Sequence, residues 1–402
     1  MKIVVADTFS SKEIEEMKKM GHEVIYEPKV LGADFEKLMR EVNPVVLIVR
    51  SKKTTKEVID AGPKLEMVIR AGTGCDTIDV AHCSQKGIYV CNCPGKNSVA
   101  VAELTIGLMI AIDRRITEGD KLLKEGRWAK GKFTDCLGLK GRTIGLLGIG
   151  NIGKEVAKRC LAFDMKVLAV DPFLTKEQIE SMGATKVETN KELCERVDIL
   201  SLHIPALPET IGMINKEFLS HMKPNSVLIN VARGNLVNEE DVLEHLDKVK
   251  DFWYGADVFK GEPASKEADF DHKLAKHPKV VGSHHVGAST QEAETAIGIE
   301  VARMVKEYGA TKKVNNCVNL ATNIKKIHCI SVNYVSKIGS LGAILAILEK
   351  NELRIEELKN EVLKDKKACA AVIYFTGDIT KKDKIIGEIK NLDGAIDVTF
   401  VY

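Results

Sequence analysis

Residues 143–153 have the sequence Thr-Ile-Gly-Leu-Leu-Gly-Ile-Gly-Asn-Ile-Gly. The apolar first half predicts a buried strand, and the glycine-rich second half leads into residues 154–163, whose pattern predicts a helix. In such a strand–turn–helix, Gly148 permits the tight turn, Gly150 lets the backbone approach a pyrophosphate, and Gly153 allows close packing of helix on strand. Unpaired N–H groups at the start of the helix favour an anion. The stretch therefore predicts a dinucleotide-binding unit.

Asp171 supports this interpretation. It follows the next predicted strand, residues 167–170, at a position where a carboxylate can accept hydrogen bonds from the hydroxyls of an adenosine ribose. The same carboxylate would repel a 2′-phosphate, and no arginine follows it immediately. The predicted cofactor is therefore NAD rather than NADP. The alternative is a structural turn that binds no ligand. Such a turn does not require the strand, the glycines, the helix and the acidic residue to occur together.

Short apolar runs alternate with amphipathic segments on both sides of this unit. The first series predicts strands at residues 3–6, 23–26, 45–49, 65–69 and 88–90. The second series predicts strands at residues 142–147, 167–170, 199–202, 227–231, 254–258 and 280–281. This alternation is typical of parallel sheets covered by helices, so we expect two doubly wound α/β domains. A helix at 99–115, apolar nearly all round, is predicted to be buried, and a last helix is predicted at 291–308.

The C-terminal residues follow a different pattern. From residue 325 to 402 the predicted order is strand, helix, strand, strand, helix, strand, which is typical of a ferredoxin-like module. The individual segments are strands at 327–332, 355–363, 370–375 and 395–402 and helices around 338–348 and 385–392.

Composition restricts the class of protein. The chain has 402 residues, enough for two or three domains, and a formal net charge of +2. Such a balanced charge favours neither nucleic acid nor a membrane surface as partner, and no apolar run is long enough to span a bilayer. The ten cysteines follow no secretory signal, so we expect reduced thiols and a cytoplasmic location. Cys91 and Cys93 lack further ligands nearby, and no metal site is predicted.

Three polar residues follow later strands of the second series. Arg233 comes after the strand at 227–231, Glu262 after the next one, and His285 after the last. Each alone could be a surface arginine, a loop glutamate or a histidine at a helix start. Because parallel strands end at one edge of a sheet, where doubly wound folds bind ligands, we interpret the three together as a site.

The combined pattern resembles the D-isomer-specific 2-hydroxyacid dehydrogenases and, among them, the D-3-phosphoglycerate dehydrogenases. The resemblance extends to residue 320. The matching stretches are residues 49–51, 69–76, 97, 101–104, 148–153, 203–205, 232–234, 257–263 and 285–290. It implies a discontinuous substrate-binding domain, residues 1–97 and 286–320, around an NAD-binding domain, residues 98–285. The implied reaction is NAD-dependent oxidation of D-3-phosphoglycerate to 3-phosphohydroxypyruvate, the first step toward serine.

The resemblance assigns roles to individual residues. His285 would be the acid–base group, Glu262 would hydrogen-bond to it and favour imidazolium, and Arg233 would bind the substrate carboxylate. The implied cofactor-binding residues are Gly148, Gly150, Asn151, Ile152, Gly153, Asp171, His203, Ala232 and Asp257. The implied substrate-binding residues are Arg50, Arg70, Gly72, Thr73, Gly74 and Asn97, with Arg50 and Arg70 as candidates for the phosphate.

The sequence departs from the family pattern at two positions. His284 stands where a proline is usual, and Ala264 stands where a second proline often follows Glu262-Pro263. The first departure places two imidazoles side by side. We assign the catalytic role to His285 because it directly precedes the Val-Gly-Ala-Ser-Thr run of residues 286–290.

Two further segments resemble parts of the family. Residues 128–132 are similar to a segment at the subunit interface, so a homodimer or homotetramer is expected. The C-terminal module resembles an ACT domain, but Tyr334, Ser336 and Ile338 occupy the turn where serine-inhibited relatives have His and Asn. Serine control is therefore expected to be weak or absent.

Two alternatives to this function are open. A glyoxylate or hydroxypyruvate reductase, or another D-2-hydroxyacid dehydrogenase, would have the same three polar residues and no phosphate-binding cations. An NAD-sensing binding protein, such as a corepressor, could retain them without turnover. A panel of 2-hydroxy and 2-keto acids discriminates between these possibilities.

Overall fold

The computed structural model describes residues 1–263, 267–321, 328–364 and 366–401. The chain divides into two compact units, Met1–Asn319 and Leu320–Tyr402. Two of the sequence-based predictions, the departure at Ala264 and the start of the C-terminal module at residues 325–327, lie outside the described residues.

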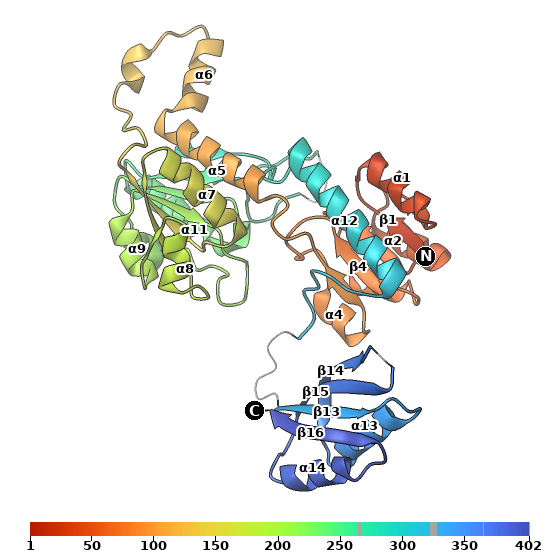
Figure 1. Cartoon of the computed structure of the whole chain (residues 1–402). Coiled ribbons are helices and arrows are strands. Elements are labelled where there is room, and N and C mark those ends of the chain that lie inside the picture. The colour runs from red at the N-terminus through yellow and green to blue at the C-terminus, as the bar shows by residue number, and fades with distance from the viewer. Residues whose placement is uncertain (264–266, 322–327, 365, 402) are drawn as a thin grey trace. The chain divides into compact units, whose positions relative to one another are not determined.

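The first sheet of the larger unit has five parallel strands in the order β2-β1-β3-β4-β5. The strands are β1 (Lys2–Val5), β2 (Glu23–Tyr26), β3 (Val46–Val49), β4 (Met67–Arg70) and β5 (Tyr89–Cys91). The helices of this part are α1 (Ser11–Lys19), α2 (Gly32–Val42), α3 (Lys56–Asp60), α4 (Val80–Gln85) and α12 (Gln291–Thr311). Helices α1 and α12 cover one face and α2, α3 and α4 the other (Figure 1). Alternate residues of β1 enter the two cores, so both faces of the sheet are buried.

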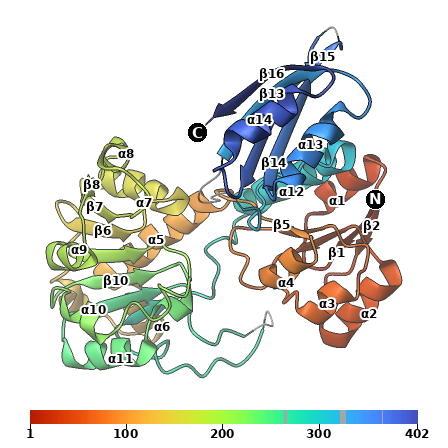
Figure 2. The ribbon, with the colours of Figure 1, turned by 90° about the horizontal axis from the view of Figure 1, so that it is seen from below.

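The second sheet has seven parallel strands in the order β12-β11-β10-β9-β6-β7-β8. The strands are β6 (Thr143–Leu147), β7 (Lys166–Val170), β8 (Thr185–Lys186), β9 (Ile199–Leu202), β10 (Val227–Asn230), β11 (Trp253–Ala256) and β12 (Val280–Gly282). Its helices are α5 (Ser98–Asp113), α7 (Asn151–Ala162), α8 (Lys176–Ser181), α9 (Asn190–Arg196), α10 (Lys216–Ser220) and α11 (Glu239–Lys248). Helices α5, α7 and α8 pack on one face and α9, α10 and α11 on the other (Figure 2).

The order of strands in the second sheet reverses between β6 and β9. In doubly wound folds such a reversal opens a crevice at the carboxyl ends of the strands, where ligands bind. The two predicted doubly wound α/β parts are confirmed, and α5 is buried along most of its length as its apolar sequence predicts. Helix α6 (Ile116–Lys124) and the short helix η1 (Lys130–Phe133) project from the end of α5 (Figure 1).

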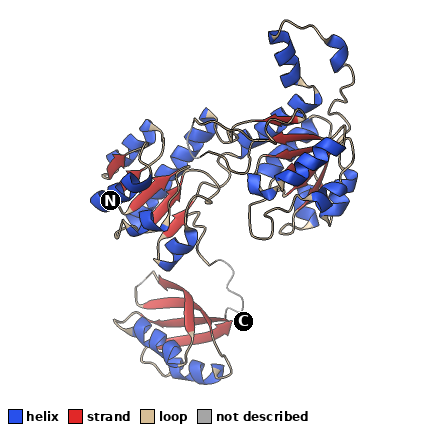
Figure 3. Cartoon of the chain, turned by 180° about the vertical axis from the view of Figure 1, so that it is seen from behind, coloured by secondary structure: helices blue, strands red, loops and turns tan. Residues whose placement is uncertain are grey.

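The C-terminal unit has a four-stranded antiparallel sheet in the order β14-β15-β13-β16. Its elements are β13 (His328–Val335), α13 (Ser340–Lys350), β14 (Arg354–Val362), β15 (Ala368–Thr376), α14 (Lys382–Lys390) and β16 (Ala395–Val401). Both helices pack on one face of this sheet (Figure 3), with Ile330, Ile344 and Ile373 in the shared core. The predicted βαββαβ order is therefore confirmed, whereas the resemblance to an ACT domain stays a prediction. Among the described helices, none is long and apolar enough to cross a membrane.

Candidate active site

Two of the three glycines in the turn after β6, Gly148 and Gly153, leave no room for a side chain. Gly148 has a φ of +87°, and a Cβ atom there would lie 2.8 Å from the carbonyl oxygen of His203. A Cβ on Gly153 would lie 2.5 Å from the carbonyl oxygen of Gly148. Gly150 instead faces open space, since a Cβ atom on it would meet nothing within 4 Å. The turn therefore leaves room beside the first N–H groups of α7, which suits the pyrophosphate of a dinucleotide.

Asp171 lies at the end of β7 next to this turn. One carboxylate oxygen accepts a hydrogen bond from the Ile149 N–H at 3.1 Å, and the other accepts one from the Phe173 N–H at 3.0 Å. The side chain is largely buried. These bonds fix the carboxylate while leaving further lone pairs to accept from ribose hydroxyls.

We expect Asp171→Ala to weaken NAD binding by about ten- to a hundredfold, since hydrogen bonds to a charged group each contribute about 1.5–3 kcal/mol. The ratio of kcat/KM with NAD to kcat/KM with NADP should fall, because the charge that repels a 2′-phosphate is removed. Asp171→Asn is the matched variant, since it preserves the shape and removes the charge. Equal efficiency of the parent protein with both cofactors would contradict the assignment.

His203 follows β9 at the opposite side of the turn. Its Nε2 lies 2.9 Å from the Ser201 hydroxyl, while its Nδ1 is buried without a partner among the described residues. Burial lowers the pKa of His203 to about 3, so the imidazole is neutral at physiological pH. A buried nitrogen without a partner beside an open glycine turn fits a site that a ligand completes.

The predicted hydrogen bond between His285 and Glu262 is present. His285 Nδ1 lies 2.6 Å from Glu262 Oε2, and Glu262 Oε1 accepts a hydrogen bond from the Phe259 N–H at 2.8 Å. Burial is the largest influence on Glu262 and by itself would raise its pKa, but the contact with His285 and the positive charge of Arg233 outweigh it. The net effect lowers the pKa of Glu262. The carboxylate therefore stays ionised at neutral pH.

Glu262→Gln is expected to lower turnover by about ten- to a hundredfold, because hydrogen bonds to a charged group contribute about 1.5–3 kcal/mol and the amide carries no charge. The measurement is kcat of the variant and of the parent at saturating substrate and cofactor. An unchanged kcat would mean that the 2.6 Å contact between His285 and Glu262 does not matter for turnover.

Asp257 holds the loop that presents His285. Its carboxylate accepts hydrogen bonds from the Ser283 hydroxyl at 2.6 Å, the Val286 N–H at 2.9 Å and the Gly287 N–H at 2.8 Å. Its carbonyl oxygen accepts from the His285 N–H at 2.7 Å. His285 has a φ of +53°, which residues with a side chain rarely adopt. These bonds to one buried aspartate stabilise the unusual backbone and fix the direction of the imidazole.

Arg233 lies at the end of β10. Its Nε donates to Asp76 Oδ2 at 2.8 Å, and its Nη1 donates to the carbonyl oxygen of Ala232 at 2.7 Å. A Cβ on Gly74 would lie only 1.7 Å from Nη2 of Arg233. The guanidinium therefore rests on the backbone of the loop after β4, and Arg233 brings the carboxyl ends of the two sheets to one place.

The loop after β4 is held by its own contacts. Thr73 Oγ1 donates to Asn97 Oδ1 at 2.9 Å, and Asn92 Nδ2 donates to the Thr73 carbonyl oxygen at 2.6 Å. Arg70 packs on the same loop, where a Cβ on Gly72 would lie 1.5 Å from Nη1 of Arg70. The loop is thus placed between the guanidinium groups of Arg70 and Arg233.

Arg70 and Arg50 differ in their surroundings. Nε of Arg70 is buried without a partner among the described residues. Burial lowers the pKa of Arg70, and the charge of Arg233 lowers it further, although an arginine stays protonated. Arg50 Nη1 instead donates to Glu294 Oε1 at 2.9 Å. Of the two candidates for a phosphate, Arg70 has the unpaired donor and Arg50 already has a carboxylate.

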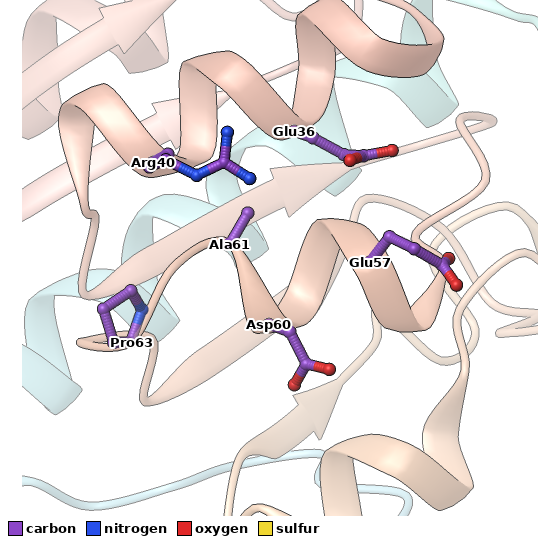
Figure 4. A pocket seen from close by; sticks show the side chains of 6 residues that line it. All are labelled: Glu36, Arg40, Glu57, Asp60, Ala61 and Pro63. Carbon is purple, nitrogen blue, oxygen red and sulfur yellow. The ribbon is translucent and has the colours of Figure 1, made fainter.

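His284 and one surface hollow take no part in these contacts. His284 is exposed, and no hydrogen bond or ion pair of its side chain is found within the described ranges. A surface hollow between α2 and α3, lined by Glu36, Arg40, Glu57, Asp60, Ala61 and Pro63, contains none of the predicted site residues (Figure 4). Its Asp60 carboxylate lies 2.9 Å from His82 Nε2 and 3.0 Å from Lys86 Nζ, as in an ordinary solvated ion cluster.

Sequence reasoning missed Asp76 and the structural part that Asp257 plays. Asp76 belongs to the stretch 69–76 that resembles the family, but we assigned it no role from the sequence. Its position two residues after Gly74, a predicted substrate-binding residue, could have indicated that it lies at the site. Its partner Arg233 lies 157 residues further along the chain, and no local pattern predicts a contact of that range.

Comparisons with known proteins agree with this geometry. Residues 106–287 match the family model described as D-isomer specific 2-hydroxyacid dehydrogenase, NAD binding domain. The chain is 38% identical over 322 residues to D-3-phosphoglycerate dehydrogenase of Methanocaldococcus jannaschii, covering 80% of this chain and 60% of the relative. It is 42% identical over 275 residues to hydroxypyruvate reductase of Thermotoga maritima, covering 68% of this chain and 87% of the relative.

A solved structure is also similar. The NAD+-bound 3-phosphoglycerate dehydrogenase of Entamoeba histolytica gives a TM-score of 0.66 at 29% identity, covering 79% of this chain and 98% of that one. The chain therefore belongs to the D-isomer specific 2-hydroxyacid dehydrogenase family, and the prediction of NAD as cofactor is confirmed. It spans only about 60% of the length of the Methanocaldococcus jannaschii relative.

Proposed function

We propose that the chain is an NAD-dependent dehydrogenase that oxidises D-3-phosphoglycerate to 3-phosphohydroxypyruvate. The observation that supports the chemistry most directly is the 2.6 Å contact between His285 Nδ1 and Glu262 beside Arg233. Because Nδ1 is engaged by the carboxylate, Nε2 of His285 is the nitrogen available to a substrate hydroxyl. The open glycine turn and the unpartnered Nδ1 of His203 among the described residues support a bound dinucleotide.

In this reaction His285 takes the hydroxyl proton from the substrate at Nε2, and Glu262 stabilises the imidazolium that forms. NAD held at the glycine turn of residues 148–153 would supply the acceptor for the hydride that leaves C2. Arg233 binds the substrate carboxylate with its planar guanidinium and polarises the oxygen on C2. The backbone amides of residues 72–75 contribute donors for the second carboxylate oxygen. In the direction of reduction, His285 returns the proton.

The choice of a phosphorylated substrate rests on Arg70. A phosphate needs cations beyond those that bind the carboxylate, and Arg70, whose buried Nε has no partner in the described part of the chain, lies across the loop after β4 from Arg233. Two relatives named D-3-phosphoglycerate dehydrogenase support this choice. The alternative substrate class, hydroxypyruvate or glyoxylate, is favoured by the relative from Thermotoga maritima, whose name is hydroxypyruvate reductase.

Turnover of 3-phosphoglycerate, glycerate, D-lactate, hydroxypyruvate and glyoxylate tests the proposal. We expect Arg70→Ala to lower kcat/KM for 3-phosphoglycerate by about ten- to a hundredfold, in line with one lost charge-assisted interaction, and to leave glycerate nearly unaffected. Arg40→Ala, in the hollow between α2 and α3, is the control. A parent protein that oxidises both substrates equally would indicate the reductase, and one with no turnover at all would indicate an NAD-sensing binding protein.

The remaining assignments are proposals of the same kind. We propose residues 1–97 and 286–320 as the substrate-binding domain, since α12 packs on α1, and residues 98–285 as the NAD-binding domain, since α5 packs on α7. Residues 325–402 would form a regulatory or oligomerisation domain. The exposed Trp128 near η1 supports the predicted subunit contact of a homo-oligomer.

A further inference from the structure

A short segment after α12 covers the edge strand of the first sheet. Residues 316–319 run antiparallel to β5, and Cys317 forms an isolated bridge directly opposite Cys91. Two backbone hydrogen bonds flank this pair: Asn92 N to Asn316 O at 3.1 Å and Val318 N to Val90 O at 2.8 Å. Because these bonds flank the two cysteines and do not join them, the pair belongs to the class with the closest side chains.

The side chain of Asn319 fixes this register. Its Oδ1 accepts from the Val90 N–H at 2.9 Å, and its Nδ2 donates to the Ile88 carbonyl oxygen at 2.9 Å. The Cys317 thiol also donates to Asn319 Oδ1, at 3.0 Å. The segment is therefore attached to the edge of β5 on both sides of Cys317. Thermal motion along the strand would have to break several hydrogen bonds to separate the two cysteines.

In such a pair the Cα atoms lie about 4.5 Å apart, within the roughly 4.4–6.8 Å that disulfides span. We propose that Cys91 and Cys317 form a reversible disulfide when the protein meets a small-molecule disulfide such as oxidised glutathione. Both cysteines carry free-standing sulfurs that no disulfide joins in the structure. The site is separate from the catalytic pair and does not depend on the proposed substrate.

The exposure of the two thiols sets the order of the steps. Cys317 is partly exposed and Cys91 is buried. The thiolate of Cys317 attacks one sulfur of oxidised glutathione, forming a mixed disulfide and releasing the first glutathione thiolate. The thiolate of Cys91 then attacks the Cys317 sulfur and releases the second. Two protein thiols are thereby oxidised by two electrons, and one glutathione disulfide is reduced to two glutathione thiols.

The second step is expected to be slow at neutral pH. The hydrogen bond with Cys317 and burial both raise the pKa of Cys91, so little of it is thiolate. The rate of closure should therefore rise with pH. Cys91 and Cys93 lie in the same core cluster, but of these two only Cys91 stands directly opposite Cys317. The strand register therefore favours Cys91 as the partner.

The disulfide would brace the loop after β4 as well as the segment after α12. Asn92, next to Cys91, donates its Nδ2 to the Thr73 carbonyl oxygen at 2.6 Å, and the Cys93 N–H donates to the Gly72 carbonyl oxygen at 2.8 Å. Cys91 therefore lies within two residues of the Asn92 and Cys93 groups that hold the loop after β4. Arg70 and Arg233 pack against this loop.

The test is to treat the full chain with oxidised glutathione under native conditions and to count thiols after denaturation. The expected count is two below the ten of the reduced protein, restored by dithiothreitol, and a non-reducing peptide map should contain the Cys91–Cys317 peptide. Cys91→Ser should instead accumulate a stable glutathione adduct on Cys317, because the second thiol is missing.

Cys136→Ser is the matched control, since Cys136 is also partly exposed but bonds to the Phe133 carbonyl oxygen outside this region. It should form the Cys91–Cys317 bond as the parent does. Glutathione that remains on Cys317 of the parent, a different internal pair such as Cys91 with Cys93, or an unchanged count of ten thiols would each overturn the proposal. If Cys91→Ser does not fold, Cys317→Ser takes its place, because it changes a partly exposed position. In this variant Cys91 should stay reduced after the same treatment.

Discussion

His285→Ala is expected to lower kcat by about two to four orders of magnitude, the usual contribution of a positioned acid or base. We propose that the imidazole, which lies next to Glu262, exchanges a proton with the substrate hydroxyl, and the backbone that presents it is fixed by Asp257. Removing the ring leaves the hydroxyl proton to water. Binding of NAD, measured by fluorescence titration, should be nearly unchanged because the glycine turn is untouched.

The neighbouring histidine supplies the control for this variant. His284 is exposed and makes no side-chain hydrogen bond that the structure describes, so His284→Ala should change kcat by less than about threefold, as expected for a surface substitution. A larger loss in His284→Ala than in His285→Ala would reverse our assignment of the two imidazoles. Circular dichroism of both variants separates a catalytic loss from a loss of fold.

Local patterns in the sequence were sufficient to predict most of the fold. Short apolar runs identified the buried parallel strands, because both faces of such strands need apolar side chains. β8 was missed because Thr185 and Lys186 contain no apolar run. Element ends also differ by a few residues, as for α12, which continues to Thr311 beyond the predicted end at 308. Helix ends depend on capping and local contacts more than on apolar periodicity.

The candidate site was predictable only in part. The glycine turn and the residues after each strand could be located, because the topology of a doubly wound sheet brings strand ends together. The pairing of Arg233 with Asp76 joins residues from the two sheets, and the support of His285 by Asp257 depends on how two loops pack. Neither contact has a local sequence pattern. The burial of Arg70 Nε without a partner among the described residues likewise follows from the folded loop, which composition does not reveal.

Arg233→Ala is expected to lower kcat by about two to three orders of magnitude, the loss seen when a preorganised donor to a developing oxyanion is removed. KM for the 2-hydroxy acid should rise as well, because we propose that the same guanidinium binds the substrate carboxylate. This combined effect distinguishes Arg233 from His285, whose removal should affect kcat more than KM. The measurement is steady-state kinetics at saturating NAD.

Arg233→Lys should recover little of this loss. A lysine ammonium cannot donate in the planar, two-pronged geometry with which Arg233 contacts Asp76 and the Ala232 carbonyl oxygen. Arg196→Ala is the matched control, because Arg196 makes an exposed helical ion pair with Glu192 on α9 and its loss should leave both kcat and KM unchanged within about twofold. If Arg233→Ala raised KM alone, the guanidinium would bind ground state and transition state equally, and its part in polarising the C2 oxygen would have to be abandoned.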